Sequence, residues 1–201
     1  MVRRFLAGAL LAALASAGIV AAGQVTLARR DADTLQHKLA LIHRHAAVPV
    51  PRSAVRSTAV SEREVNAYLR YHAREDIPVG VVDPYVWILG DGRVSGRAIV
   101  DLDAVRKHRT RGWTDLAGYL TGRVPVQATG ILKTKDGVGR FSLQSAQVGG
   151  ITVPNFLLQE IVSYYTRTAG QPQGVALDAP FELPLSIREV RVGKGQALIL
   201  Q

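Results

Sequence analysis

Small or apolar residues alternate with polar ones along the middle of the chain. Between residues 93 and 102, the polar positions are Arg93, Ser95, Arg97 and Asp101. The positions between them are Val94, Gly96, Ala98, Val100 and Leu102. Successive side chains of a β-strand point to opposite faces, so this period of two predicts a strand with one buried face and one wet face.

Glycine-containing turns join this strand and others into three predicted hairpins. The first covers residues 85–102 with a turn at 90–92, and the second covers residues 124–148 with a turn at 135–137. The third covers residues 181–200, with strands at 181–192 and 196–200. Glycine is favoured in tight hairpin turns. The pattern therefore predicts about six strands in an antiparallel arrangement.

Helical periodicity appears in four segments. The clearest begins at Ser61, where Ser61 and Glu64 form an S-x-x-E capping box. The other three are residues 24–45, 114–120 and 154–167. Helices and hairpins thus alternate. This order predicts an α+β fold in which a curved antiparallel sheet packs on, or wraps around, helices, with an apolar helix at the N-terminus.

The N-terminus has the layout of an export signal. Arg3 and Arg4 precede residues 5–23, an uncharged stretch of nineteen that contains eight alanines and three glycines. A helix of this length spans about 28 Å, close to the roughly 30 Å hydrocarbon core of a bilayer. The segment is therefore either a cleaved signal peptide or a retained membrane anchor.

Three parts follow from these patterns. Residues 1–23 are the signal peptide or signal anchor, residues 24–60 a stalk with a proline-containing linker, and residues 61–201 the folded domain. The prolines of the linker favour an extended chain. We therefore expect residues 46–201 to fold without the N-terminal segment, in the periplasm or cell envelope.

The net charge of +9 first suggests nucleic acid, but its distribution argues against that partner. Residues 1–60 hold eight basic and two acidic residues, whereas residues 61–201 hold seventeen basic and fourteen acidic ones. The excess lies beside the apolar segment, where anionic lipid head groups are the expected partner. We predict lipid and the membrane surface as partners, with another envelope protein as the alternative and no nucleic acid.

No familiar catalytic or metal-binding motif is present. The chain has no cysteine, no G-x-S-x-G turn and no H-E-x-x-H helix. His43 and His45 flank Arg44 without a carboxylate nearby in the sequence, and Asp101 and Asp103 fit the end of a strand better than a divalent-cation site. We therefore predict a non-catalytic protein without a cofactor or a bound metal.

Two features exceed the needs of a generic domain: small residues in the middle of two strand faces, and a cationic loop that ends in tryptophan. In addition, the predicted third helix, residues 154–167, is apolar over half of its circumference. Small side chains make room for a packed helix or for an acyl chain, and a cationic loop with an indole suits a phospholipid interface or is simply solvated. The candidate lipid-binding residues are Gly96, Ala98, Trp113, Ala128, Gly130, Phe156, Leu158, Ile161, Val162 and Tyr165. The candidate head-group contacts are Arg106, Lys107, Arg109 and Arg111.

Two stretches resemble known envelope proteins. Residues 183–199, LPLSIREVRVGKGQALI, resemble the terminal hairpin of the LmeA family of envelope phospholipid-binding proteins. Residues 61–69, SEREVNAYL, are similar to the first domain helix of a related set of envelope lipoproteins. Both sets resemble the tubular lipid-binding superfamily, which implies a curved sheet around a long helix and an apolar cavity. The tethering cysteine of the lipoproteins is missing here.

The patterns and the resemblance together lead to one expected function and two alternatives. The expected function is non-catalytic binding or shuttling of a phospholipid or another acyl-chain lipid in a bacterial-type cell envelope. The first alternative is an envelope scaffold that docks another protein through its sheet face. The second is a hydrolase whose catalytic groups are not apparent in the sequence.

Overall fold

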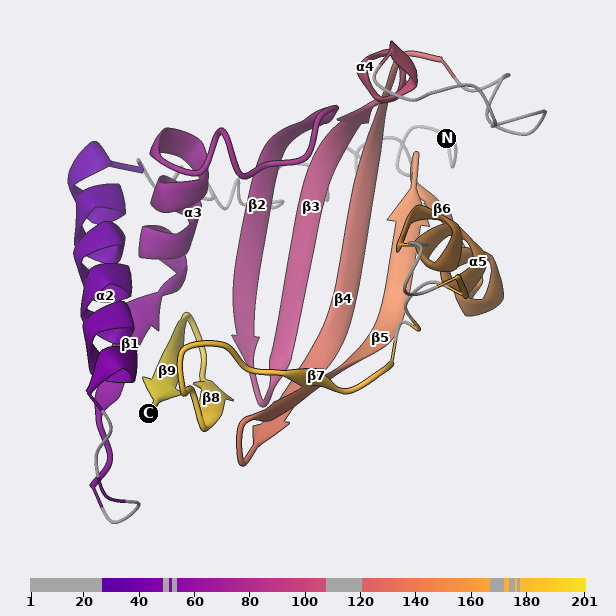
Figure 1. Ribbon diagram of the computed structural model, residues 1–201. Coiled ribbons are helices and arrows are strands. Elements are labelled where there is room, and N and C mark those ends of the chain that lie inside the picture. Colours follow the sequence, from indigo (N-terminus) through magenta and orange to yellow (C-terminus); the bar gives the residue numbers. More distant parts are fainter. Residues whose placement is uncertain are drawn as a thin grey trace, which may run out of the picture.

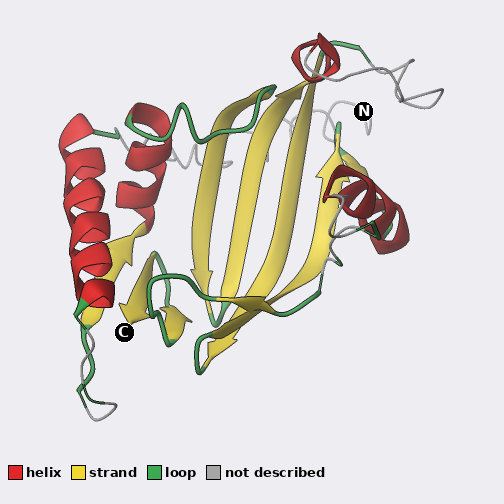
Figure 2. Cartoon of the chain, in the orientation of Figure 1, coloured by secondary structure: helices red, strands yellow, loops and turns green. Residues whose placement is uncertain are grey.

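Helices and antiparallel strands form an α+β fold in the computed structural model, which describes residues 27–48, 51, 54–107, 121–166, 172–173, 176 and 178–201 (Figures 1 and 2). The predicted fold class and the antiparallel six-stranded sheet are confirmed. The predicted apolar helix at residues 5–23 and the predicted helix at 114–120 lie outside the described residues. Among the residues described, no helix combines the length and the apolar character needed to cross a membrane.

A large sheet forms the centre of the molecule (Figure 1). Its main strands follow the order β2-β3-β4-β5, and neighbours are antiparallel. Two short strands, β6 and β7, pair with opposite ends of β5. The bounds are β2 Val81–Gly90, β3 Arg93–Asp101, β4 Arg123–Lys135, β5 Val138–Val148, β6 Ile151–Thr152 and β7 Phe181–Glu182. The first two predicted hairpins are therefore confirmed with slightly longer strands.

The third predicted hairpin lies in a second sheet of three strands, ordered β1-β9-β8. Its bounds are β1 Ser57–Ser61, β8 Glu189–Val192 and β9 Gln196–Leu200. The continuous strand predicted over residues 181–192 was wrong, because the chain turns between β7 and β8. Pro184 offers no amide hydrogen to a sheet, and Leu185 and Ser186 adopt positive φ angles of 57° and 55°.

Two helices pack beside the small sheet: α2, Arg29–Ala47, and α3, Glu62–Tyr71. Ser61 accepts a hydrogen bond from the Glu64 amide at 3.2 Å and the Glu64 carboxylate accepts one from the Ser61 amide at 2.8 Å, so the predicted capping box is confirmed. Helix α2 and strand β1 fall in the segment predicted to be stalk and linker. In the structure they belong to the packed body, since Ile42 is only 1% exposed and β1 pairs with β9 along its whole length.

An ion pair connects these two helices. The Lys38 ammonium group of α2 lies 2.7 Å from one oxygen of the Glu64 carboxylate in α3. Burial acts to raise the pKa of Glu64, but the hydrogen bonds from Lys38 and from the Ser61 amide outweigh it and hold this pKa below its usual value. Glu64 therefore has two roles: it completes the capping box of α3 and it connects α3 to α2.

Polar groups from outside the large sheet form hydrogen bonds with backbone amides and carbonyls at the free edge of β2. The Asn66 side chain of α3 bonds both the amide and the carbonyl of Val86, each at 2.7 Å. The Ile88 amide donates to Glu62 at 2.7 Å, and the Ile88 carbonyl accepts from the Gly195 amide at 2.7 Å. Unpaired strand edges invite aggregation, so this arrangement both protects β2 and joins the two sheets.

The remaining helices lie at the borders of the large sheet. Helix α4, Leu102–Lys107, follows β3, and α5, Asn155–Thr166, lies beside β5 (Figure 1). The middle strands β3 and β4 thus lie between α3 on one side and α5 on the other.

Candidate apolar binding site

The strand register assigns most apolar side chains of the large sheet to one face, here called the inner face; Trp87, Ile99 and Ile131 are among the exceptions. Residues directly opposite each other in neighbouring strands point to the same side of a sheet. The inner-face residues are Val86, Ile88, Val94, Gly96, Ala98, Val100, Val124, Val126, Ala128, Gly130, Leu132, Phe141, Leu143, Ala146 and Val148. The opposite, outer face carries mainly polar residues such as Arg97, Gln127 and Gln147.

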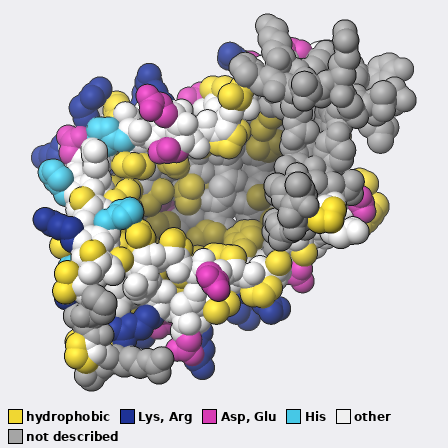
Figure 3. Space-filling model, viewed as in Figure 1, with side chains coloured by type: hydrophobic (Ala, Val, Ile, Leu, Met, Phe, Trp, Pro, Cys, Tyr) yellow, Lys and Arg dark blue, Asp and Glu magenta, His cyan; other side chains and the backbone are white. Residues whose placement is uncertain are grey.

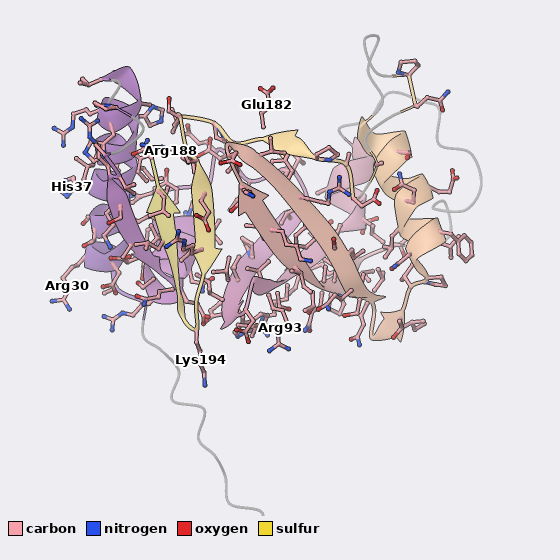
Figure 4. All side chains as sticks on the ribbon, turned by 90° about the horizontal axis from the view of Figure 1, so that it is seen from below. Arg30, His37, Arg93, Glu182, Arg188 and Lys194 are labelled. Carbon is pink, nitrogen blue, oxygen red and sulfur yellow. The ribbon has the colours of Figure 1, made fainter. Side chains whose placement is uncertain are left out.

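The inner face lines a hollow. Figure 3 shows a depression between the α2–α3 side and the α5 side, with hydrophobic side chains in it and around it. Figure 4 shows Arg93, an outer-face residue, and Glu182 of β7 on opposite sides of the sheet. Of the described helices, α3 contacts mainly β2 and α5 contacts mainly β5. No described helix therefore covers the middle of β3 and β4.

One end of the hollow is closed by the strands that follow α5. The Thr134 hydroxyl of β4 donates to the Val190 carbonyl at 3.0 Å and accepts from the Val190 amide at 2.7 Å, which fixes β8 against β4. The Phe181 ring of β7 covers Gly139, where an added Cβ would lie 2.6 Å from the ring. These contacts close the hollow beside the β4–β5 turn.

Two glycines of the inner face have opposite surroundings. A Cβ added to Gly130 would lie 2.3 Å from the Phe141 ring, so this glycine makes room for an aromatic side chain. A Cβ added to Gly96 would meet only the Tyr85 carbonyl oxygen, at 3.9 Å, among the described residues. The space above Gly130 is thus filled, while the described part of the chain leaves the space above Gly96 open.

The open position belongs to a row of small side chains that crosses four strands. Val86, Gly96, Ala128 and Ala146 are consecutive partners from β2 to β5. Ala98 lies one inner-face step along β3 from Gly96. The structure therefore brings together three of the candidate residues predicted from the sequence, namely Gly96, Ala98 and Ala128, and adds Val86 and Ala146.

The other candidates have different outcomes. On α5, Phe156 is 68% exposed and Leu158 is half-buried. The side chains of Ile161, Val162 and Tyr165 are outside the described set, and so is Trp113. Of the predicted head-group contacts, Arg106 and Lys107 end α4 with side chains that are not described, and Arg109 and Arg111 lie outside the described residues.

The outer face has an aromatic and cationic cluster that the sequence analysis did not single out. The Arg97 guanidinium lies 5.8 Å from the centre of the Tyr85 ring and 5.5 Å from that of the Trp87 ring. Burial, together with the negative charge of Glu62, raises the pKa of the Tyr85 phenol. Tyr85, Trp87 and Arg97 alternate with inner-face residues, which is the signal that places them on one face.

The two aspartates of the D-x-D sequence act as local caps. Asp101 accepts a hydrogen bond from the Ala104 amide at 2.9 Å, and this bond, helped by Arg123, lowers the pKa of Asp101. Asp103 accepts one from the Gly122 amide at 3.0 Å. Within the described part of the chain, no group of three or more histidine, cysteine or acidic residues is placed to hold a metal ion.

Comparison with known proteins gives no match: neither a family model, nor a curated protein, nor a solved structure is similar to this chain.

Proposed function

We propose that this protein binds the acyl chain of a lipid on the inner face of its large sheet. The observation that carries the proposal is the row from Val86 to Ala146, with open space above Gly96 and no described helix over β3 and β4. An apolar concave surface of this kind is the usual form of a site for an apolar ligand. The resemblance of the terminal hairpin to envelope phospholipid-binding proteins favours the same ligand class.

The driving force would be the removal of apolar surface from water. Each CH₂ group of a buried acyl chain contributes about 0.8 kcal/mol, before the cost of ordering the chain. Small side chains matter because they let the chain lie close to the strands, where dispersion contacts are strongest. The flanking Val94, Val126 and Leu132 would supply the walls of such a site.

The proposal includes a location in the cell envelope. It rests on the sequence alone: Arg3 and Arg4 before the apolar residues 5–23 favour export with the N-terminus in the cytoplasm. A reporter enzyme that is active only outside the cytoplasm, fused after Gln201, should therefore be active. Activity of a cytoplasm-restricted reporter at the same position would contradict this location.

Acyl-chain binding is tested by placing a larger side chain in the space above Gly96. Gly96→Leu places a branched side chain above the small row, and the nearest described atom to the new Cβ is 3.9 Å away, so the strand accommodates it. Gln127→Leu is the matched control, because Gln127 is exposed on the outer face of the neighbouring strand. The full-length chain is purified in a non-ionic amphipathic polymer, and bound lipid is extracted and measured by mass spectrometry.

The wild type and Gln127→Leu should carry lipid in a fixed ratio to protein, and Gly96→Leu should lose most of it without a lower melting temperature. Equal lipid in all three proteins would contradict the acyl-chain site. A wild type that carries no lipid but retains a bound protein through the inner face would instead support the scaffold alternative.

A further inference from the structure

A second cavity lies where helix α3, the following turn, the first half of β2 and the middle of β3 meet. Its volume is about 890 Å³. The residues that line it include Leu69, Arg70 and Arg74 of the helix side, Ile77 and Val81 of the turn and β2, and Tyr85 and Arg97 of the strands. A cavity of this size is large enough for a small organic ligand.

Three arginines line this cavity: Arg70, Arg74 and Arg97. Among the described residues, no carboxylate lies within 4.0 Å of Arg70, Arg74 or Arg97. One acidic residue, Asp83, also lines the cavity. Glu62, which lies beside Tyr85, adds a second negative charge near the cavity. Three positive charges against two negative ones still leave the cavity cationic, and this net charge attracts an anion.

Aromatic rings hold two of these arginines in place. Arg97 lies over the Tyr85 and Trp87 rings, and Arg70 lies 5.8 Å from the centre of the Tyr71 ring. A guanidinium that stacks on a ring still presents its N–H groups at its edge. This leaves the fork geometry free to bind two oxygens of a phosphate or a carboxylate.

The third arginine is positioned by the helix end. The Arg74 side chain donates to the Arg70 carbonyl at 3.4 Å, after the last turn of α3. This contact places the Arg74 side chain next to the Arg70 backbone, and both residues line the cavity.

Several other lining residues are apolar. They include Leu69, Ile77, Val81 and Pro84, while Asn66 and Asp83 add polar groups. A free inorganic anion would leave the apolar residues in contact with water. A ligand with a charged group and an apolar portion would cover both the arginines and the apolar residues.

We propose that this cavity binds an anionic group with an attached apolar portion, a phosphate or carboxylate in which Arg97, Arg70 and Arg74 contact the oxygens. The site is separate from the acyl-chain site, since Gly96 and Arg97 are neighbours on β3 that point to opposite faces. It therefore does not depend on the proposed function. The same chemistry has two sources, the head group of an anionic phospholipid and a soluble organic phosphate.

Calorimetric titration of the full-length chain in a non-ionic amphipathic polymer tests the proposal. The ligands are dihexanoyl phosphatidylglycerol, dihexanoyl phosphatidylcholine and glycerol phosphate. We expect the anionic lipid to bind and the zwitterionic lipid to bind at least tenfold more weakly. Binding of the lipid alone identifies a head group as the source, and equal binding of glycerol phosphate identifies a soluble phosphate compound.

Variants show whether the arginines act as a site. Arg97→Gln should weaken binding at least tenfold, and Arg97→Lys should weaken it less, because the charge remains and the fork is lost. Arg93→Gln is the matched control, an exposed arginine on the same strand and the same face that does not line the cavity (Figure 4). Gly96→Leu should leave this binding unchanged even if it removes the acyl chain.

Three results would overturn the proposal. These are no binding of either anionic ligand, equal binding of the zwitterionic lipid, and an equal loss of affinity in Arg93→Gln and Arg97→Gln. The last result would mean that diffuse surface charge attracts the anion. Melting temperatures of all variants identify any loss that comes from unfolding, and Arg97→Lys, which retains the charge and the bulk, then decides the outcome.

Discussion

The two sheets of this protein use their apolar residues differently. Around the small sheet and its helices, six apolar side chains are buried, although Leu39, Val190, Leu198 and Ile199 are half-buried. The six are Ala32, Leu35, Ile42, Val60, Ala67 and Leu200. On the inner face of the large sheet, only Ile88, Gly130 and Ala146 reach that level, and the other positions are partly exposed. The same kind of residue thus forms a dry core in one region and an accessible surface in the other.

The difference shows which part stabilises the fold and which part is available to a ligand. Helices α2 and α3 complete the core beside the small sheet, whereas no described helix completes one over β3 and β4. Apolar surface left uncovered within a folded domain often marks a binding site. Substitutions in the two regions should therefore lower the free energy of unfolding by different amounts.

The largest effect should come from removing α2. A chain that begins at Ala46 lacks Leu35 and Ile42, so β1 and α3 lose their apolar cover. We expect residues 27–201 to unfold cooperatively and residues 46–201 to show no cooperative transition. Circular dichroism during thermal denaturation compares the two chains. Cooperative unfolding of the shorter chain with an unchanged midpoint would restore the stalk interpretation.

Shortening a single side chain to alanine should show the same difference between the two regions, with a smaller loss of stability. Ile42→Ala should lower the free energy of unfolding by about 2–5 kcal/mol, because it creates a cavity in a filled core. Val126→Ala, on the half-buried inner face, should cost less than about 1.5 kcal/mol, since it leaves no closed cavity. Urea denaturation measures both values. Similar costs at the two positions would mean that the inner face is packed as tightly as the small-sheet core.

The two glycines provide the same comparison within one face. Gly130→Ala should cost about 1–3 kcal/mol, because its Cβ would overlap the Phe141 ring. Gly96→Ala should instead stabilise the strand by about 0.5 kcal/mol, because alanine loses less backbone entropy than glycine. Combining Gly130→Ala with Phe141→Leu should recover part of the loss. Urea denaturation measures the free energy of unfolding of these variants. A lower value for Gly96→Ala than for the wild type would mean that the space above Gly96 is filled.

The smallest effect concerns the ion pair of the packed region. The pKa of Glu64 is lowered in the folded state, so its contribution to stability is present above the unfolded-state pKa and is lost as the pH falls through the folded-state pKa. Glu64→Gln should therefore lower the free energy of unfolding by about 1 kcal/mol at pH 7 and by less at pH 3.

Urea denaturation at the two pH values checks this dependence on Glu64. Glu75→Gln, at an exposed position in the turn after α3, is the matched control and should have no effect at either pH. An equal loss at pH 7 and pH 3 in Glu64→Gln would contradict the role of the carboxylate charge.

Local signals in the sequence predicted local structure well. The alternation of residues 93–102 identified the two faces of β3, and the S-x-x-E sequence identified the start of α3. Both depend on interactions within one element. The complete inner face was harder to predict, because an extra residue in β5, Gln144, breaks the alternation of that strand opposite Thr129 and Gly130 of β4.

Long-range pairing could not be predicted from these patterns. Hairpin periodicity indicates that β8 and β9 pair, but it does not indicate that β9 also pairs with β1, more than a hundred residues earlier. The packing of α2 could not be predicted for the same reason, since the stripe of Leu35, Leu39 and Ile42 does not identify the surface that it covers. The arginines that line the second cavity come together only in three dimensions.

A cysteine scan tests the acyl-chain site most directly, because the chain contains no cysteine and each variant therefore has a single thiol. Ala98→Cys and Val126→Cys place neighbouring thiols on the inner face, and Ile99→Cys and Gln127→Cys place them on the outer face. The rate of reaction with a water-soluble maleimide is measured for the full-length chain with its lipid removed and then restored. We predict that lipid slows the reaction at least tenfold at residues 98 and 126 and leaves residues 99 and 127 unchanged. Equal rates with and without lipid at residues 98 and 126 would contradict binding on the inner face.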